Sequence, residues 1–159
     1  MRLYFVSRAI DTRNFTANFY LSGSYSDIRM ENFDQDGLYS ISRLTAKLEI
    51  QGQGTIEYEL VRHLAPLTIS KVFNALPITD TVHFYDDKFA YMHTKLQVGA
   101  EKPRTTFKSG EIAFLTNSSS VCFFLQECRV SPMNLMGVAK TSIDMLRDCR
   151  AGTNLILKK

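Results

Sequence analysis

Apolar and polar residues alternate along two neighbouring stretches of the chain, residues 44–50 and residues 55–60. This alternation is typical of half-buried strands, because successive side chains of a strand point to opposite faces of the sheet. The residues between the two stretches, Gln51-Gly52-Gln53-Gly54, have the composition of a turn. The pattern therefore predicts a β-hairpin over residues 44–60.

Two short helices are predicted among further strands. Pro66 suits a first helical turn, where its missing N–H would have no partner, and apolar residues then recur at near-helical spacing up to Pro77. Ser142 is a good N-cap for the second helix, and Gly152 ends it. The helices are expected near 66–76 and 142–150. Strand-like segments fall at 81–85, 89–98, 111–115, 120–126 and 155–157. Many strands with two brief helices predict an all-β fold, a barrel or a sandwich.

The first 43 residues differ in composition from the rest of the chain. Residues 1–46 contain arginine but no lysine, and they are rich in Tyr, Phe, Ser and Asn. Short strand-like runs at 3–6 and 15–21 are separated by Gly- and Ser-containing breakers. We interpret 1–43 as an N-terminal β extension that packs on or joins a barrel domain over 44–159. A partly ordered tail is the alternative.

Composition and charge exclude several classes of protein. The chain has 159 residues, of which 45% are hydrophobic and 22% charged, so it is neither a disordered chain, a collagen nor a coiled coil. The net charge of +3 is too small to indicate a polyanion binder. Lys102, Arg104 and Lys108 share a predicted loop with Phe107, but such a short cluster is usually a solvated loop. We therefore predict no nucleic-acid partner.

The cysteines and the longest apolar runs bear on location. Three cysteines (Cys122, Cys128 and Cys149) form an odd, sparse set without a Cys-x-x-Cys pair. This pattern favours a reducing, cytoplasmic compartment. No apolar run approaches the roughly 20 residues that span a bilayer, and the apolar stretch 3–6 is too short for a signal-peptide core. We expect no membrane partner.

A series of short motifs, in a fixed order, resembles cyclophilins. A strand ending in Glu59-Leu60 leads through Pro66-Leu67-Thr68 into a helix, as in that family. The loop at 117–120 precedes a strand that ends in a Phe-Phe pair, and the glycine turn at 137 precedes the second helix. The resemblance covers about residues 44–159. It implies a cyclophilin-like closed β-barrel with two short helices.

The chain more closely resembles a family of small prokaryotic cyclophilin-like proteins without an established role. The shared segments keep their order along the chain: 76–78, the surroundings of Tyr85, 110–113, 121–124 and 134–137. The family usually has a Trp-Gly pair where this chain has Tyr85-Asp86. It also has a Pro-Pro-Gly turn where this chain has Thr116-Asn117-Ser118. The chain is therefore identified as a divergent member.

The resemblance also bears on activity. Cyclophilins isomerise prolyl bonds with an arginine in a Phe-His-Arg stretch, and aligning Tyr91-Met92 with their aromatic-Met pair places Asp86 at that arginine. A guanidinium donates hydrogen bonds to the proline, whereas a carboxylate can only accept them. Cys122 stands at the position of a cyclophilin glutamine. We therefore expect a noncatalytic binding module. The alternative is a peptidyl-prolyl isomerase, or another small-molecule enzyme that uses the same groove.

Other candidate chemistry is weaker. His83 and His93 are symmetric about residue 88 and would face each other across a hairpin, but no third zinc ligand has suitable spacing. Cys122 lies within an apolar strand, where a free cysteine behaves as a small hydrophobe. The serines at 118–120 lack the strand–turn–helix elbow of a hydrolase nucleophile. We predict no metal, no cofactor and no catalytic residue.

The resemblance implies an apolar groove for a peptide or small ligand, lined by aromatic side chains. Its expected residues are Tyr85, Asp86, Tyr91, Met92, Phe114, Cys122 and Phe124. Strand alternation places Cys122 and Phe124 on one side of their strand and Phe123 on the other. We assign Phe124 to the partly solvated cleft and Phe123 to the core. Oligomeric state and natural ligand are left open by the sequence.

Overall fold

The computed structural model describes residues 42–159, and the predicted N-terminal β extension lies outside the described residues except for its last two positions. The first elements of the described residues form the predicted hairpin, β1 (Arg43–Ile50) and β2 (Gly54–Val61). Buried residues alternate along both strands, and Gln53 N donates to Ile50 O across the turn at 3.0 Å. The hairpin read from the alternation is therefore confirmed.

A 3-10 turn, η2 (Arg62–Leu64), leads into helix α1 (Pro66–Ala75), which begins at the predicted proline. The second helix, α2 (Asp144–Asp148), is shorter than predicted. Ser142 still acts at its start, because Asp144 N donates to Ser142 Oγ at 3.2 Å. The hydroxyl therefore closes the turn just before the helix and does not occupy the N-cap position, which belongs to Ile143.

Eight further strands complete the fold. They are β3 (Ile78–Thr81), β4 (His83–Tyr85), β5 (Phe89–His93), β6 (Arg104–Phe107), β7 (Glu111–Leu115), β8 (Ser120–Phe124), β9 (Cys128–Ala139) and β10 (Asn154–Lys158). Four differ from the prediction. β5 ends at His93 and not at 98, and the predicted loop around Arg104 contains β6. β3 lies almost entirely ahead of the predicted segment 81–85, and β9 forms where no strand was predicted. Phe107 is buried because β6 pairs with β9 and turns this ring onto Phe124, on the outer face of the barrel wall.

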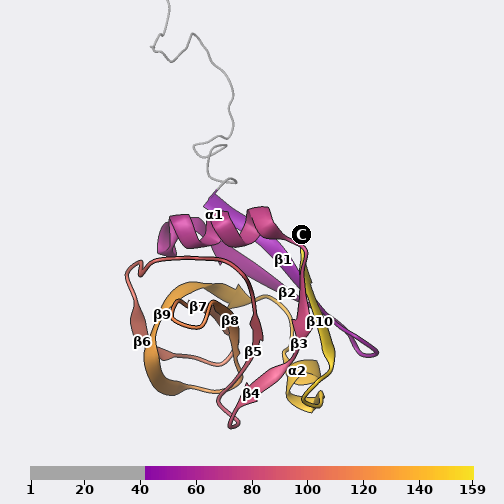
Figure 1. Ribbon diagram of the computed structural model, residues 1–159. Coiled ribbons are helices and arrows are strands. Elements are labelled where there is room, and N and C mark those ends of the chain that lie inside the picture. Colours follow the sequence, from indigo (N-terminus) through magenta and orange to yellow (C-terminus); the bar gives the residue numbers. More distant parts are fainter. Residues whose placement is uncertain (1–41) are drawn as a thin grey trace, which may run out of the picture. The chain divides into compact units, whose positions relative to one another are not determined.

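The strands form one sheet in the order β3-β10-β1-β2-β9-β7-β8-β5-β4, with β6 added on β9. Its two edge strands, β3 and β4, are consecutive in the chain and are separated only by Val82. Val82 N donates to Thr153 O at 2.8 Å, and Val82 O accepts from Gly152 N at 3.0 Å. One bent segment, 78–85, thus pairs with β10 through its first half and with β5 through its second half. The sheet curls round at this corner into a barrel (Figure 1).

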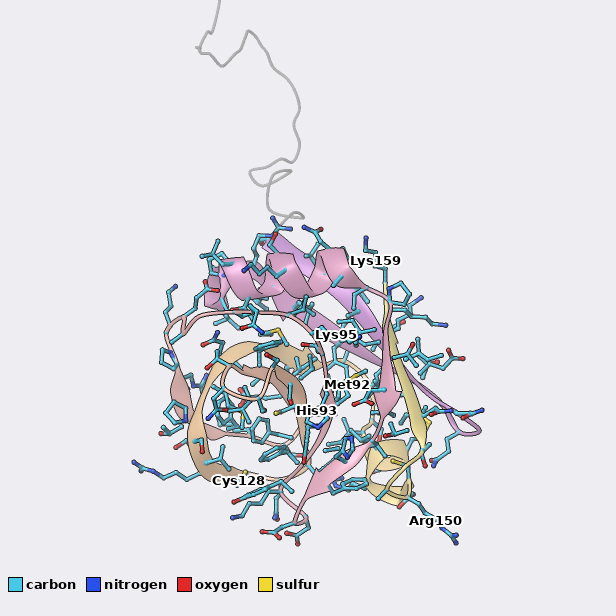
Figure 2. All side chains as sticks on the ribbon, in the orientation of Figure 1. Met92, His93, Lys95, Cys128, Arg150 and Lys159 are labelled. Atoms are coloured by element: carbon cyan, nitrogen blue, oxygen red, sulfur yellow. The ribbon has the colours of Figure 1, made fainter. Side chains whose placement is uncertain are left out.

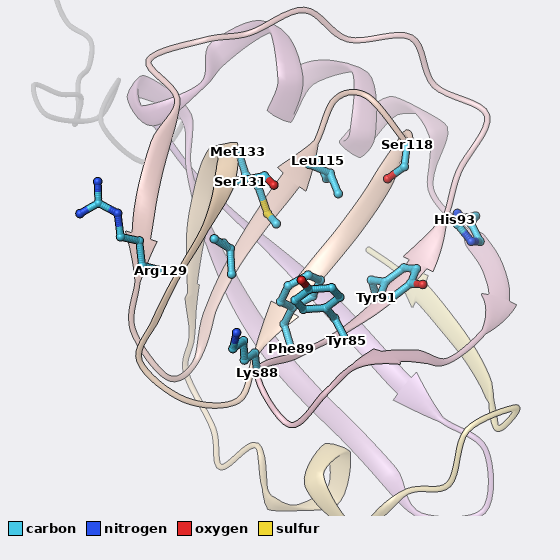
Figure 3. A pocket seen from close by; sticks show the side chains of 11 residues that line it. Tyr85, Lys88, Phe89, Tyr91, His93, Leu115, Ser118, Arg129, Ser131 and Met133 are labelled. Carbon is cyan, nitrogen blue, oxygen red and sulfur yellow. The ribbon is translucent and has the colours of Figure 1, made fainter.

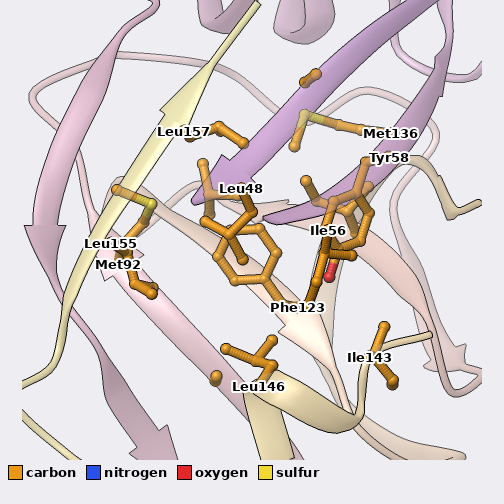
Figure 4. Close-up of a cluster of buried hydrophobic side chains, with 14 of the residues drawn as sticks. Leu48, Ile56, Tyr58, Met92, Phe123, Met136, Ile143, Leu146, Leu155 and Leu157 are labelled. Carbon is orange, nitrogen blue, oxygen red and sulfur yellow. The ribbon is translucent and has the colours of Figure 1, made fainter. Parts of the chain in front are cut away.

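Two hydrophobic clusters lie on opposite faces of the barrel wall. The larger draws residues from β1, β2 and β10 as well as from β5, β7 and β8, so it fills the interior; Figure 4 shows Phe123 there, beside Tyr58. The ring centroids of Tyr58 and Phe123 are 5.5 Å apart. The smaller is drawn from the β5–β9 side alone and is called the outer cluster. Its members are Phe89, Phe107, Ala113, Cys122, Phe124, Met133 and Leu135.

A polar network fixes the long segment between β5 and β6. The Glu101 carboxylate accepts hydrogen bonds from the Leu67 and Thr68 amides, at 3.1 and 2.6 Å, and from the Thr68 hydroxyl at 2.6 Å. It therefore caps α1 from more than 30 residues away, where Ala65 provides no side-chain cap. The buried Asn134 amide accepts from Glu101 N and donates to Gly99 O and to Thr68 Oγ1.

The capping interaction also shifts the titration of Glu101. Burial by itself would raise the pKa of this carboxyl, but the hydrogen bonds from Thr68 and Leu67, together with the charge of Lys102, lower the pKa below its ordinary value of 4.5. The network is thus charged as well as hydrogen-bonded at neutral pH. It holds the segment 94–103 against α1 and β9.

Candidate ligand pocket

The β4–β5 hairpin carries most of the aromatic side chains of the candidate site. His83 lies opposite Tyr91, and Tyr85 lies opposite Phe89. The predicted pairing of His83 with His93 is therefore wrong by two residues. The three-residue turn decides the register: Lys88 N donates to Tyr85 O at 3.1 Å, and Asp86 adopts a left-handed φ of 52°.

This register gathers five rings on the outer face of the barrel, because directly opposed residues and alternate residues share a face of a sheet. The rings of Tyr85 and Phe89 are stacked at 5.1 Å between centroids, and those of His83 and Tyr91 at 5.3 Å. His93 contacts the Tyr91 ring edge-on at 5.4 Å. The hairpin thus presents a continuous aromatic surface.

A second layer of rings supports this surface from below. Phe89 packs on Phe124 of β8 at 5.2 Å, and Phe124 is stacked on Phe107 of β6 at 4.4 Å with an angle of 12° between the planes. All three rings are buried. The aromatic surface is therefore backed by well-packed side chains, which restricts its movement.

A pocket with a volume of about 250 Å³ opens over these rings. The β4–β5 hairpin forms one wall, and residues of β7, of the loop after it and of β9 form the other, as Figure 3 shows. The lining residues are Tyr85, Lys88, Phe89, Tyr91, His93, Leu115, Ser118, Arg129, Val130, Ser131 and Met133. Rings and aliphatic groups dominate, with hydroxyl groups and cations at the margins.

Within residues 42–159, the side chains that line the pocket and carry a full charge are of one sign: Lys88 and Arg129 line it, and no aspartate or glutamate does. Figure 3 shows the Lys88 side chain next to Phe89, whereas the Arg129 head group points away from the other lining residues. The Lys88 ammonium lies 5.6 Å from the centroid of the Tyr85 ring. Lys88 is thus the cation that a bound molecule would meet.

His93 stands at the rim, held by hydroxyl groups. Ser118 Oγ donates to Ser120 Oγ at 3.0 Å, and Ser120 Oγ lies 3.1 Å from His93 Nδ1. Ser120 is fully buried, so this contact fixes the plane of the imidazole against the barrel. The arrangement orients His93 and connects it to Ser118 in the pocket lining.

The comparisons with known proteins agree with this architecture. A family model described as Cyclophilin-like matches residues 45–158. The chain belongs to this family. A search of curated proteins found no match.

Two solved structures share the fold of the cyclophilin-like domain. One is the solution structure of the hypothetical protein AF2241 from Archaeoglobus fulgidus, with 21% identity and a TM-score of 0.63 over 74% of this chain and 95% of that one. The other is the structure of McbB in complex with tryptophan, with 14% identity and a TM-score of 0.61 over 72% of this chain. This chain covers 44% of McbB. At these identities, the likeness shows the fold alone.

The residues expected to line a groove in the cyclophilin-like domain are dispersed by the fold. Tyr85 and Tyr91 line the pocket. Asp86 lines a different cavity, of about 550 Å³, next to Arg147 and Gln126.

Met92 and Phe114 lie in the barrel interior, fully buried. Met92 and His93 (Figure 2) are consecutive on β5, so they point to opposite faces of the sheet, and His93 is the one that reaches the pocket.

The expected assignment of β8 is half right. Phe123 lies in the core, as predicted, and Cys122 and Phe124 share the opposite face. However, Phe124 is 1% exposed and does not line the pocket, so its predicted partial solvation is wrong. β6 covers this part of the outer face and places Phe107 on Phe124.

Cys122 is fully buried in the outer cluster, and burial raises the pKa of its thiol far above the ordinary value. This supports the structural role predicted for it and excludes it from the pocket lining.

Sequence reasoning missed the other nine lining residues, which are Lys88, Phe89, His93, Leu115, Ser118, Arg129, Val130, Ser131 and Met133. For β5 a signal existed, because residues 89, 91 and 93 share a face of any strand that contains Tyr91. For β7 and β9 the sequence offered none.

Two observations concern metals and membranes. The rings of His83 and His93 are 4.9 Å apart, and Asp80 Oδ2 lies 3.6 Å from His83 Nε2. Across residues 42–159, no group of three His, Cys, Asp or Glu side chains is placed to hold a metal ion. In the same part of the chain, neither the length nor the apolar character of any helix suffices to cross a membrane.

Proposed function

We propose that the cyclophilin-like domain is a noncatalytic binding module whose pocket takes a small, planar, largely apolar group. The observation that carries the proposal is the aromatic wall of Tyr85, Phe89, Tyr91 and His93 opposite the aliphatic Leu115 and Met133. A flat ring placed between these walls would contact aromatic faces and aliphatic groups at the same time. Concave, mostly apolar sites with few polar groups are the usual form of small-ligand sites.

The size of the pocket favours a compact ligand. About 250 Å³ lies just below the roughly 300–1,000 Å³ typical of ligand pockets. One or two fused rings, or a single aromatic side chain of a peptide, would fill it. An extended peptide would have to lie mostly outside.

The pocket is also well ordered before a ligand arrives. Phe89 is buried and packs on Phe124, and β5, the strand that carries it, is paired to β8 along its whole length. A preformed site loses little side-chain entropy on binding, so even a small contact area yields measurable affinity.

The arrangement of cations supports binding over prolyl isomerisation. Cyclophilins place a guanidinium beside the proline, but here Asp86, at the aligned position, belongs to a different cavity. Arg129 is the one guanidinium among the lining residues, and its head group points away from them (Figure 3).

Tryptophan is a suitable first probe. It combines a planar ring with the right size, and McbB, which shares the fold, was solved in complex with tryptophan. The sequence of this protein contains no tryptophan. The indole fluorescence of the probe is therefore observed directly, without a signal from protein indole groups.

The test is a titration of the full chain into tryptophan, with two variants of one residue. Tyr91→Phe keeps the ring and should bind as the parent does. Tyr91→Leu removes the ring and should weaken binding about three- to tenfold, in line with the roughly 0.5–1.5 kcal/mol of an aromatic pair. An unsaturable signal, or equal binding by both variants, would refute the proposal.

A second measurement tests whether the domain lacks prolyl isomerase activity. In a standard assay with a proline peptide, the protein should leave isomerisation at its uncatalysed time of tens to hundreds of seconds. Clear acceleration that is lost in Tyr91→Leu would show that the pocket is an isomerase site.

A further inference from the structure

Lys88 is set apart from the other cations of the described chain by its place at the pocket. Arg129 also lines the pocket, but its head group points away from the other lining residues (Figure 3). Within residues 42–159, the ammonium of Lys88 forms no ion pair and no hydrogen bond, and it lies over the Tyr85 ring. It is half-buried at the edge of the pocket. A cation at the pocket edge without a counter-charge is available to pair with an anionic group of a ligand.

The backbone of Lys88 is fixed on both sides. Its N–H donates to Tyr85 O at 3.1 Å, and its carbonyl accepts from Leu125 N at 2.9 Å. The side chain therefore starts from a rigid point between the hairpin and the end of β8. Its charge is brought to one end of the pocket and is not spread over a mobile loop.

The neighbouring carboxylates do not neutralise this charge. Asp86 and Asp87 belong to the same turn but line the other cavity, and Asp87 Oδ1 accepts a hydrogen bond from Gln126 at 3.2 Å. Among the described residues, the pocket lining holds cations and hydroxyl groups and no acidic side chain. An anion would be attracted to this site, whereas an ammonium group would be repelled.

We propose that the ligand is a small aromatic acid, with its ring between the walls and its carboxylate at Lys88. The inference rests on the proposed function, because it assigns a charge to the planar ligand of the same pocket. The ring would lie over Tyr91, toward Leu115 and Met133, and the carboxylate would accept a hydrogen bond from the Lys88 ammonium. The hydroxyl of Ser118 lies at the opposite end of the pocket (Figure 3).

Three indole probes of similar size but different charge test the inference. They are indoleacetate, which is an anion, indoleacetamide, which is neutral, and tryptamine, which is a cation. Each is titrated with the full chain and followed by its own fluorescence. Indoleacetate should bind about fivefold more tightly than indoleacetamide, the effect expected of one partly exposed charge-assisted contact, and tryptamine should bind most weakly. Added salt should weaken the binding of indoleacetate and leave that of indoleacetamide unchanged.

Two lysine variants locate the effect. Lys88→Met keeps an apolar stem of similar length and should abolish the difference between indoleacetate and indoleacetamide. Lys140→Met changes the net charge equally at an exposed position that does not line the pocket, and it should preserve the difference. Loss of the preference in both variants would assign it to net charge and overturn the role of Lys88.

The outcomes separate this inference from the proposed function. Equal binding of indoleacetate and indoleacetamide would refute the inference that the ligand is an acid, but it would remain consistent with a pocket that binds planar rings. Failure of all three probes to bind would overturn both. A short peptide that ends in a free tryptophan carboxylate distinguishes the source of the acid: tighter binding than indoleacetate assigns it to a chain end, and weaker binding to a free small molecule.

Discussion

Replacing Phe124 by alanine tests how the outer face of the barrel is built. The ring is 1% exposed and lies between Phe107 and Phe89, with centroid distances of 4.4 and 5.2 Å. Removing a buried phenylalanine side chain costs about 3–5 kcal/mol, since the transfer free energy is lost and a cavity remains. Two aromatic contacts, each worth about 0.5–1.5 kcal/mol, place Phe124→Ala in the upper part of this range.

Phe123→Ala is the matched control. The two residues are neighbours on β8, both are buried, and they belong to opposite faces of the wall. We therefore expect similar losses of unfolding free energy, measured by urea denaturation with circular dichroism and tyrosine fluorescence. The slopes against urea should match those of the parent, so that the midpoints report stability.

Ligand binding then distinguishes the two faces. Phe124→Ala removes the ring behind Phe89 and should weaken the binding of indoleacetamide, whereas Phe123→Ala should leave the affinity of the folded protein unchanged. Phe124→Leu provides a milder variant if the alanine protein does not fold. A loss below about 1 kcal/mol for Phe124→Ala, beside the full 3–5 kcal/mol for Phe123→Ala, would mean that Phe124 is solvated and that β6 does not cover it.

Three further predictions concern the framework of the barrel. Asn134→Ala breaks three hydrogen bonds of a buried side chain and should lower the unfolding free energy by about 2–4 kcal/mol in a urea titration; an unchanged midpoint would contradict the network. Gly137→Ala would place a methyl group 1.9 Å from Glu59 O and should prevent soluble folding, whereas Gly99→Ala meets nothing within 4 Å and should fold normally, as gel filtration would show. The pKa of Glu101 is lower in the folded chain than its ordinary 4.5, so its stabilising contribution is complete above that pH and is lost as the pH falls toward the folded value. Urea midpoints measured from neutral to acidic pH should therefore fall less in Glu101→Gln than in the parent.

Local features were predictable from the sequence because neighbouring residues decide them. Alternation specified β1 and β2, and the conformation of Pro66 specified the start of α1. Alternation also separated Phe123 from Phe124 correctly. The barrel was predicted from the series of cyclophilin-like motifs in their fixed order, because no local pattern indicates how a sheet closes.

The partners of distant residues were not predictable. The sequence shows no reason for Glu101 to cap α1, because the contact exists only where β9 brings Asn134 beside both. Likewise, the basic residues around Phe107 predict a solvated loop, whereas the structure has strand β6 there, and Phe107 becomes buried only because β6 pairs with β9. Such pairings depend on the order of strands in the sheet.

The pocket shows the same division. Composition and alternation were enough to predict an aromatic, strand-rich segment around Tyr85 and Tyr91. The other features of the pocket were not predictable. The turn with a left-handed Asp86 places Tyr91, and not His93, opposite His83, and the strand order β9-β7-β8-β5 brings Met133 opposite these rings. The burial of Phe124 was not predictable either. The two-residue alternation of a strand tells which side chains share a face, but not which other element covers that face. A ligand site built from several strands is therefore fixed by long-range pairing, which alternation along any one strand does not contain.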